Sequence, residues 1–222
     1  MVNMQRSLLV ALSLSLAATP GLLAGTLTVR PGVPSNGGSA RFAGSQGLEI
    51  DVATPNRNPA FVQSSHPAAE PTYRVRFYFN PRTLTMADGD QFDLFVAYDG
   101  ADPVPPTITG NAVLRLSVGQ AAGVKQLTAF ARLNGGTESQ IATPIPLANA
   151  WRSIEINWAK ATASGANNGR LDIWVDGRPQ TGLTGLNNDT LTINYARWGA
   201  VAGVDAGTSG TFRLDDFASQ RT

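Results

Sequence analysis

The chain of 222 residues contains no cysteine, so disulfides, thiolate metal sites and a thiol nucleophile are excluded. It has a single histidine, His66, and no G-x-S-x-G motif, which leaves a serine–histidine triad without a convincing arrangement. Charged residues make up only 15% of the chain and form no basic cluster. Nucleic acid is therefore not an expected partner.

Long apolar runs are also missing, except at the N-terminus. There, Arg6 precedes an apolar run that ends in small residues and a proline, the pattern of a secretory signal peptide. The run is too short and wrongly flanked for a membrane anchor. Thr26 stands where a lipoprotein would carry its acylated cysteine, which argues against a lipid anchor. We therefore expect residues 1–25 to be removed, residues 26–222 to form one domain, and the protein to be secreted or periplasmic.

The sequence is rich in glycine and proline, and its apolar and polar residues alternate in many segments. With 23 Gly and 14 Pro, its balance favours many short strands joined by turns. Apolar and polar residues alternate with period 2 in "GLEIDVA", "YRVRFYF", "AVLRLSV", "RLDIWVDG" and several other segments. Asp176-Gly177 lies between two such segments and predicts a tight hairpin turn. The stretch after "GLEIDVA", up to Tyr73, is left open as a long loop or a short helical turn. The pattern predicts an antiparallel sandwich of about ten or more strands.

Three segments of the C-terminal half carry a family resemblance: "GRLDIWVDG", "RWGA" and the terminal "FRLDDF". They resemble the closing strands of the concanavalin A-like lectin/glucanase superfamily, in particular the laminin-G-like domains of bacterial extracellular proteins. The resemblance implies an all-β, two-sheet antiparallel jelly-roll sandwich. It also implies a module that binds carbohydrate or protein, because these are motifs of shape rather than of catalysis.

Aromatic residues at outward positions give the strongest functional signal. Flat rings stack on sugar rings, while Arg, Asp and Asn bind hydroxyl groups. The alternation predicts a glycan-binding platform that contains Trp174, Tyr78, Phe95, Phe130, Arg76 and Asp172. The alternative is that an outward tryptophan simply packs beneath a loop. Trp158, Trp198 and Met86 are expected in the core.

The letters E-I-D at residues 49–51 raise the question of catalysis, because a strand with E-I-D-x-x-E is characteristic of laminarinase-type glucanases. Retaining hydrolysis needs two carboxyl groups about 5–5.5 Å apart. Here the acid/base position falls on Thr54, so Glu49 and Asp51 are better interpreted as solvated residues of an outward strand face. Gln63 and His66 are likewise spaced wrongly for the Q-x-H motif of jelly-roll polysaccharide lyases, since two intervening residues put them on opposite strand faces.

A calcium ion is the one cofactor left open. Laminin-G-like domains often bind Ca²⁺ at a loop edge, although no EF-hand spacing occurs here. The candidate oxygen ligands are Asp172, Asp176, Asn187, Asn188, Asp189, Asp205, Asp215 and Asp216. The sequence thus predicts a secreted, non-catalytic glycan-binding protein. A structural or protein-interaction domain and a glycan-cleaving enzyme are the two alternatives, and the oligomeric state stays open.

Overall fold

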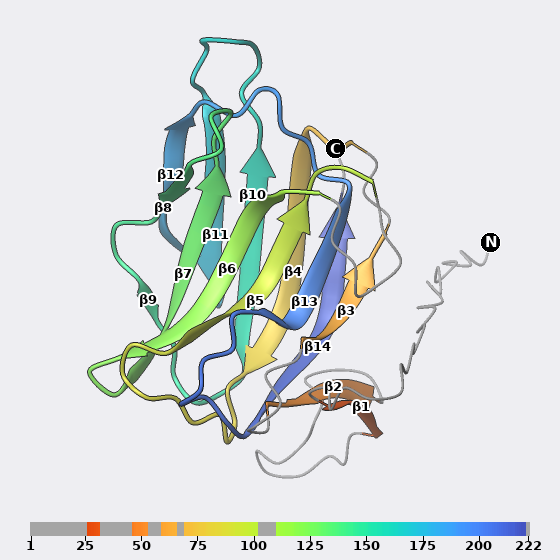
Figure 1. The fold of residues 1–222 in the computed structure, drawn as a ribbon, viewed down its shortest axis with the longest axis vertical. Helices are drawn as coiled ribbons and strands as arrows, with labels where there is room; N and C mark the ends of the chain where they lie inside the picture. Colours follow the sequence, from red (N-terminus) through yellow and green to blue (C-terminus); the bar gives the residue numbers. More distant parts are fainter. Residues whose placement is uncertain (1–25, 32–45, 53–58, 66–68, 102–109, 221–222) are drawn as a thin grey trace, which may run out of the picture.

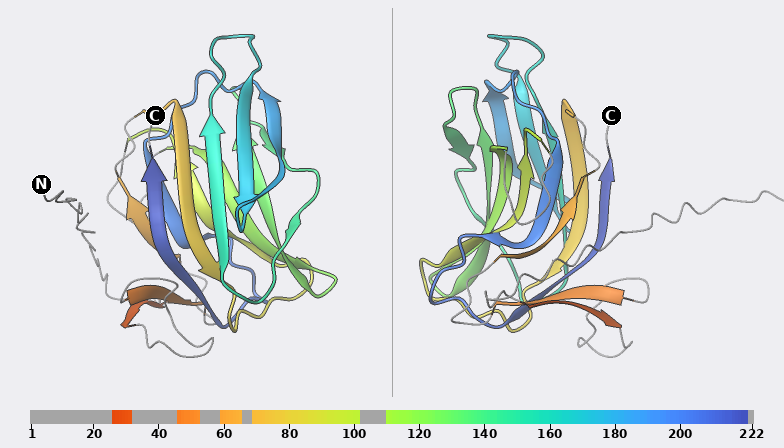
Figure 2. Two further views of the ribbon diagram at one scale, coloured as in Figure 1. Left: turned by 180° about the vertical axis from the view of Figure 1, so that it is seen from behind. Right: turned by 45° about the vertical axis from the view of Figure 1, so that its right-hand side comes forward.

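The structure, a computed structural model, describes residues 26–31, 46–52, 59–65, 69–101 and 110–220. The described ranges contain β-strands and no helix. The strands form two antiparallel sheets packed face to face (Figures 1 and 2). The predicted all-β jelly-roll sandwich is confirmed. Among the described residues no helix is long and apolar enough to span a membrane. The predicted leader, residues 1–25, lies outside the described residues.

Sheet A runs in the order β1-β2-β14-β4-β10-β11-β12 and lies behind sheet B in Figure 1. Its strands are β1 (Thr26–Pro31), β2 (Gln46–Asp51), β14 (Thr211–Gln220), β4 (Thr72–Asn80), β10 (Arg152–Ala159), β11 (Gly169–Val175) and β12 (Arg178–Leu186). Sheet B runs in the order β3-β13-β5-β6-β7-β8, and β9 pairs with β7. Its strands are β3 (Ala60–Ser64), β13 (Tyr195–Ala202), β5 (Gln91–Tyr98), β6 (Ala112–Ala121), β7 (Val124–Arg132), β8 (Glu138–Gln140) and β9 (Ile145–Pro146).

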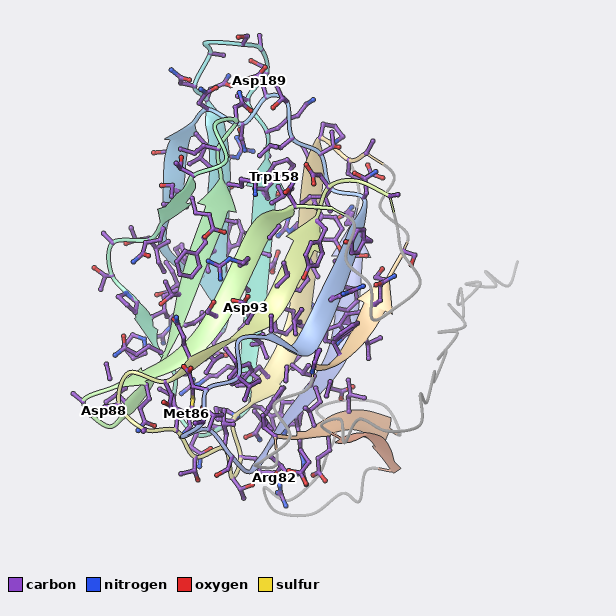
Figure 3. The ribbon with its side chains drawn as sticks, in the orientation of Figure 1. Arg82, Met86, Asp88, Asp93, Trp158 and Asp189 are labelled. Atoms are coloured by element: carbon purple, nitrogen blue, oxygen red, sulfur yellow. The ribbon has the colours of Figure 1, made fainter. Side chains whose placement is uncertain are left out.

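The core lies between the two sheets and follows from the alternation of each strand. In β4, Val75 and Phe77 are buried in the core, whereas Arg74 and Arg76 are exposed on the other side. Successive side chains of a strand point to opposite faces, so each half-buried strand contributes one apolar row. Trp158, Trp198 and Met86 all lie in this core, as the sequence predicts; Figure 3 labels Trp158 and Met86.

The Asp176-Gly177 turn is formed as predicted and joins β11 to β12. Both residues have positive φ, 53° for Asp176 and 71° for Gly177, and the flanking Val175 and Arg178 pair directly. Left-handed backbone at both central positions is the requirement of a type I′ hairpin turn. The turn thereby fixes how β11 and β12 pair next to it, at one edge of sheet A.

Strand β5 departs from the simple alternation, and the prediction that Phe95 faces outward is wrong. The register between β5 and β6 shifts between Asp93 and Phe95, which indicates a bulge or irregularity. A bulge inserts one residue and reverses the phase of those that follow. Phe95 is therefore fully buried in the core, where its ring stacks on Phe77 with centroids 6.0 Å apart. Val96 and Tyr98 take the outward positions instead.

Candidate functional site

The outer face of sheet A presents a regular grid of polar and aromatic side chains. Neighbouring strands β11, β10 and β4 place Trp174 opposite Glu155, and Glu155 opposite Arg76. The next row toward one end consists of Asp172, Asn157 and Arg74. Tyr78 lies two residues from Arg76 on the same face of β4. Four of the six predicted glycan-binding residues, namely Trp174, Tyr78, Arg76 and Asp172, thus share one face.

Both aromatic rings on this face lie beside arginines. The Arg74 guanidinium carbon is 5.6 Å from the centroid of the Trp174 ring and also pairs with Glu155. Arg76 is 5.8 Å from the Tyr78 ring and bonds Asp216 at 3.0 Å. Distances below about 6 Å are in the range of cation–π attraction. These contacts orient the arginine side chains, which stay 52% and 44% exposed.

Two shallow depressions lie on this face, near opposite ends of β4. One, of about 320 Å³, is lined by Arg74, Val75, Arg76, Glu155, Ala218, Ser219 and Gln220. The other, of about 300 Å³, is lined by Asn80, Arg82, Asn149, Ala150 and Trp151. Arg74 and Asn80 are six positions apart along the strand, so these two residues of the depressions lie about 20 Å apart. Tyr78 lies between them.

Phe130 lies on the opposite side of the molecule, on the outer face of sheet B, so the prediction of one platform for all six residues is wrong. Arg115 covers its ring at 4.3 Å from the centroid. The same guanidinium donates to Asp93 at 2.9 Å and to both carboxylate oxygens of Glu138. The hydrogen bond to Glu138 is the main cause that raises the pKa of Arg115 above its ordinary value. This network holds a guanidinium, rather than an open ring face, at the surface.

A buried polar cluster on the outer face of sheet B was not predicted from the sequence. Arg197, only 1% exposed, donates from Nε to Gln63 Oε1 at 2.7 Å. Its guanidinium lies 4.5 Å from the Phe61 ring and within 6 Å of the rings of Tyr98 and Tyr195. The two tyrosine rings stack with centroids 4.7 Å apart. Strict alternation in "YARWG" could have shown that Arg197 faces away from Trp198.

Desolvation by burial raises the pKa of Tyr98 to about 12, and the nearby Arg197 charge only partly offsets this. The phenol consequently keeps its proton at neutral pH. Within the described part of the chain, the buried hydroxyl of Tyr195 has no hydrogen-bond partner. This cluster therefore presents the neutral phenol of Tyr98 beside one guanidinium.

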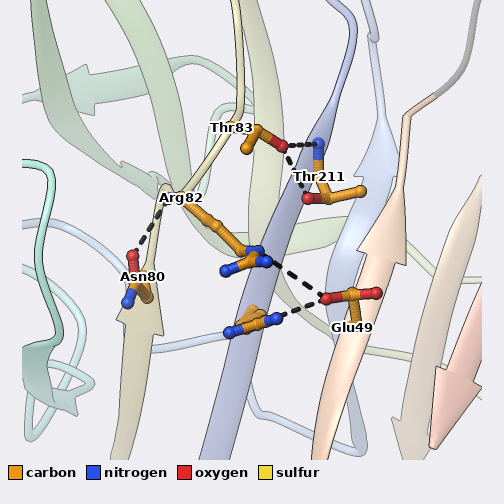
Figure 4. A network of polar contacts seen from close by, with 6 residues as sticks. Glu49, Asn80, Arg82, Thr83 and Thr211 are labelled. Carbon is orange, nitrogen blue, oxygen red and sulfur yellow. Dashed lines mark hydrogen bonds and ion pairs between the residues drawn. The ribbon is translucent and has the colours of Figure 1, made fainter. Parts of the chain in front are cut away.

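The E-I-D strand is β2, and its Glu49 has a structural partner. Glu49 Oε2 accepts a hydrogen bond from Arg213 Nε at 2.9 Å and lies 3.9 Å from Arg82 Nε (Figure 4). The side chain of Glu49 is only 16% exposed, so it is ion-paired rather than solvated as the sequence suggested. Asp51 is half-buried on the same strand. Thr54 and His66 lie outside the described residues.

Three of the residues considered for calcium have other partners in the structure. Asp176 pairs with Arg152, Asp189 accepts from Asn134, and Asp205 accepts from the Gln91 backbone. No group of three or more His, Cys, Asp or Glu in the described ranges could hold a metal ion. These oxygens instead serve loops and hairpins, and a calcium site stays a prediction.

Comparisons with known proteins identify the fold and nothing finer. No family model matches the chain, and no curated protein matches it. Among solved structures, the globular domain of T. cruzi calreticulin has a TM-score of 0.57 at 11% identity, over 90% of this chain and 80% of that one. Alginate lyase Aly36B has a TM-score of 0.54 at 12% identity, over 79% and 80% of the two chains. Cellulose induced protein Cip1 has a TM-score of 0.53 at 16% identity, over 93% of this chain and 90% of that one.

The chain has the concanavalin A-like jelly-roll fold. The resemblance seen in the sequence is confirmed at this level, while the laminin-G-like subclass stays a prediction. Because one fold hosts many functions, the function of this concanavalin A-like sandwich has to be argued from its surfaces.

Proposed function

We propose that this concanavalin A-like protein binds a glycan across the outer face of sheet A. The observation that carries the proposal is the grid on β4, β10 and β11, where half-buried Trp174 and Tyr78 alternate with charged and amide side chains. An aromatic ring removes the apolar face of a pyranose from water, and flanking carboxylates, amides and guanidiniums exchange hydrogen bonds with its hydroxyl groups.

The spacing of the grid suits an extended ligand. Neighbouring strands lie about 4.8 Å apart, so Trp174 on β11 and the Arg76 position on β4 are about 10 Å apart across the sheet. The two depressions extend the same face along β4. Such a surface favours a chain of several sugars over a single enclosed monosaccharide. Solved structures with this fold include proteins named alginate lyase and cellulose induced protein, which is consistent with a carbohydrate ligand.

The predicted leader supports the same proposal. A secreted or periplasmic protein meets polysaccharides of the cell envelope or of the surroundings, and this chain has no cysteine that oxidation outside the cytoplasm would affect. We therefore place the proposed binding outside the cytoplasm.

The test is retention of the mature chain on a panel of insoluble polysaccharides, with affinity electrophoresis for soluble ones. Trp174→Ala should lose most of the retention, whereas Phe130→Ala, on the opposite face, should keep it. Both variants remove one half-buried ring from a strand, so the pair is matched for effects on folding. Equal retention of both variants would refute the assignment to sheet A.

A second candidate is cleavage of an acidic polysaccharide by β-elimination, and the Arg197 cluster favours it. A guanidinium could neutralise a uronate carboxylate, a base from solvent could take the C5 proton, and a protonated phenol such as Tyr98 could donate to the leaving oxygen as the C4–O bond breaks. However, Arg197 is 1% exposed and Tyr98 is 4% exposed, so a polymer does not reach them in this conformation. Recording unsaturated ends during the same screen tests this function. Their release, abolished in Tyr98→Phe, would replace the binding proposal with an enzymatic one.

A further inference from the structure

The depression at the Asn80 end of β4 has a composition unlike the rest of the sheet A face. It is lined by one cation, two amides, an alanine and an indole, and it contains no carboxylate: Asn80, Arg82, Asn149, Ala150 and Trp151. At the other depression, Glu155 pairs with Arg74. Of the two depressions, only the one at the Asn80 end therefore lacks a carboxylate among its lining residues.

Asn80 is built into the wall of this depression. It is 8% exposed, and its Oδ1 accepts a hydrogen bond from the Arg82 backbone N–H at 3.0 Å. That bond fixes the amide orientation, because Oδ1 has to face the turn. The Nδ2 group makes no hydrogen bond to a described residue. A side chain more than nine-tenths buried thus keeps a donor for a ligand.

The backbone of Arg82 is held in the left-handed region, at φ 47°. Besides the Asn80 bond, Leu84 N–H donates to the Pro81 carbonyl at 2.8 Å and closes the turn. Few non-glycine residues adopt this conformation, and such residues persist only where the surroundings support them. The turn fixes the direction in which the Arg82 side chain leaves the backbone, alongside β14 and β2 (Figure 4).

The guanidinium of Arg82 has hydrogen-bond donors that no described residue engages. Among the described residues its one charged contact is Glu49, and that contact, at 3.9 Å, is longer than a hydrogen bond. Glu49 has its closer partner in Arg213, at 2.9 Å. The Arg82 side chain is 33% exposed, and among the described residues no acceptor binds its five N–H donors. Figure 3 shows Arg82 at the end of the sandwich away from Asp189.

We infer that this depression binds a sugar that carries a carboxylate, and thus that the ligand of the sheet A face is an acidic polysaccharide. The inference rests on the proposed glycan binding and names its ligand class. A guanidinium matches the two oxygens of a carboxylate, and hydrogen bonds to charged groups are stronger than neutral ones. The amides of Asn80 and Asn149 can bind ring hydroxyls, and the Trp151 indole lines the same hollow.

The position of the depression supports this assignment. Asn80 and Tyr78 lie on one face of β4, and Trp151 immediately precedes β10, the neighbouring strand of β4. A polymer that stacks on Trp174 and Tyr78 would therefore reach Arg82 if it continued along β4. The carboxylate contact would select the charge of the polymer, while the aromatic residues would bind it irrespective of charge.

The experiment compares polygalacturonate with its methyl ester, two polymers that differ in the charge of the same group. The mature chain should bind polygalacturonate at least about ten-fold more tightly. Arg82→Gln should weaken binding to polygalacturonate far more than binding to the ester and so remove this preference, and Arg82→Lys should restore part of it. The control is Arg178→Gln, since Arg178 is exposed on β12 outside both depressions. Thermal unfolding of each variant verifies the fold.

The outcomes separate this inference from the proposed function. Equal binding of the two polymers, still dependent on Trp174, would overturn the carboxylate assignment and keep the sheet A face. If the preference disappears in Arg82→Gln but persists in Trp174→Ala, the depression is supported as the carboxylate site and the wider platform is refuted. A preference retained in Arg82→Gln would overturn the site, and binding to neither polymer nor to any neutral glycan would overturn both. Binding of a sulfated polymer alone would also contradict the carboxylate assignment.

Discussion

Arg213 on β14 lies opposite Glu49 on β2, and its Nε donates to Glu49 Oε2 at 2.9 Å. The Arg213 side chain is only 6% exposed, and that of Glu49 16%. The carboxylate that the E-I-D motif offers for catalysis thus compensates a buried guanidinium. A charge removed from water needs such a partner, because desolvation without one is costly.

We expect Glu49→Gln to lower the free energy of unfolding by about 1–3 kcal/mol, since it removes the carboxylate charge beside Arg213. Retention on neutral glycans should be unchanged in the folded variant. Chemical denaturation and the polysaccharide screen measure the two effects. Undiminished stability together with a loss of activity on a glucan would show that Glu49 is catalytic after all.

Phe95 and Phe130 provide a matched test of the two sides of sheet B. Phe95→Ala should lower the free energy of unfolding by about 3–5 kcal/mol, because it opens a cavity beside Phe77. Phe130→Ala should cost less, because its ring is only half-buried beneath Arg115. Urea denaturation of both variants gives the comparison. A similar small loss in both would contradict the buried position of Phe95.

The sequence predicted most of the fold because the apolar rows of β4, β10 and β11 keep strict alternation. It did not predict the phase change in β5, since a bulge depends on how β5 pairs with β6 and leaves no local signal in "QFDLFVAY". The sequence does not predict strand β3, because proline- and asparagine-rich segments surround it. Its pairing with β13 is a tertiary contact.

The candidate site was predicted only in part, for a similar reason. Alternation shows that Trp174, Tyr78 and Phe130 face outward, but it does not say from which sheet. Only the strand order places Trp174 and Tyr78 on sheet A and Phe130 on sheet B. The Asn80–Arg82 depression could not be predicted, because it depends on a left-handed turn that brings a loop arginine beside the end of β10.

Gly199 allows β13 to lie against β3. Its φ is 137°, and a Cβ there would lie 2.3 Å from the Ala60 carbonyl oxygen. Gly199→Ala should therefore lower the free energy of unfolding by more than about 1 kcal/mol. Thermal unfolding measures the loss, and Gly177→Ala is the control for positive φ alone, since its Cβ would meet no atom within 4 Å. An equal loss in both variants would show that the contact with β3 is unimportant.

Tyr98 predicts a pH dependence of stability whose direction follows from burial. Burial raises its pKa to about 12 in the folded protein, above the ordinary value of 10.0 for a tyrosine, so the unfolded chain loses the proton first. The resulting stabilisation is complete below pH 10 and is lost as the pH rises toward 12, by an amount of up to roughly 2–3 kcal/mol.

Denaturant titrations at pH 9, 10 and 11 should show this decline, and Tyr98→Phe should make it shallower. Tyr78→Phe, which removes a half-exposed phenol from the other sheet, is the control. A decline that is identical in all three proteins would mean that the Tyr98 phenol is hydrated, and the Arg197 cluster would then be open to a ligand.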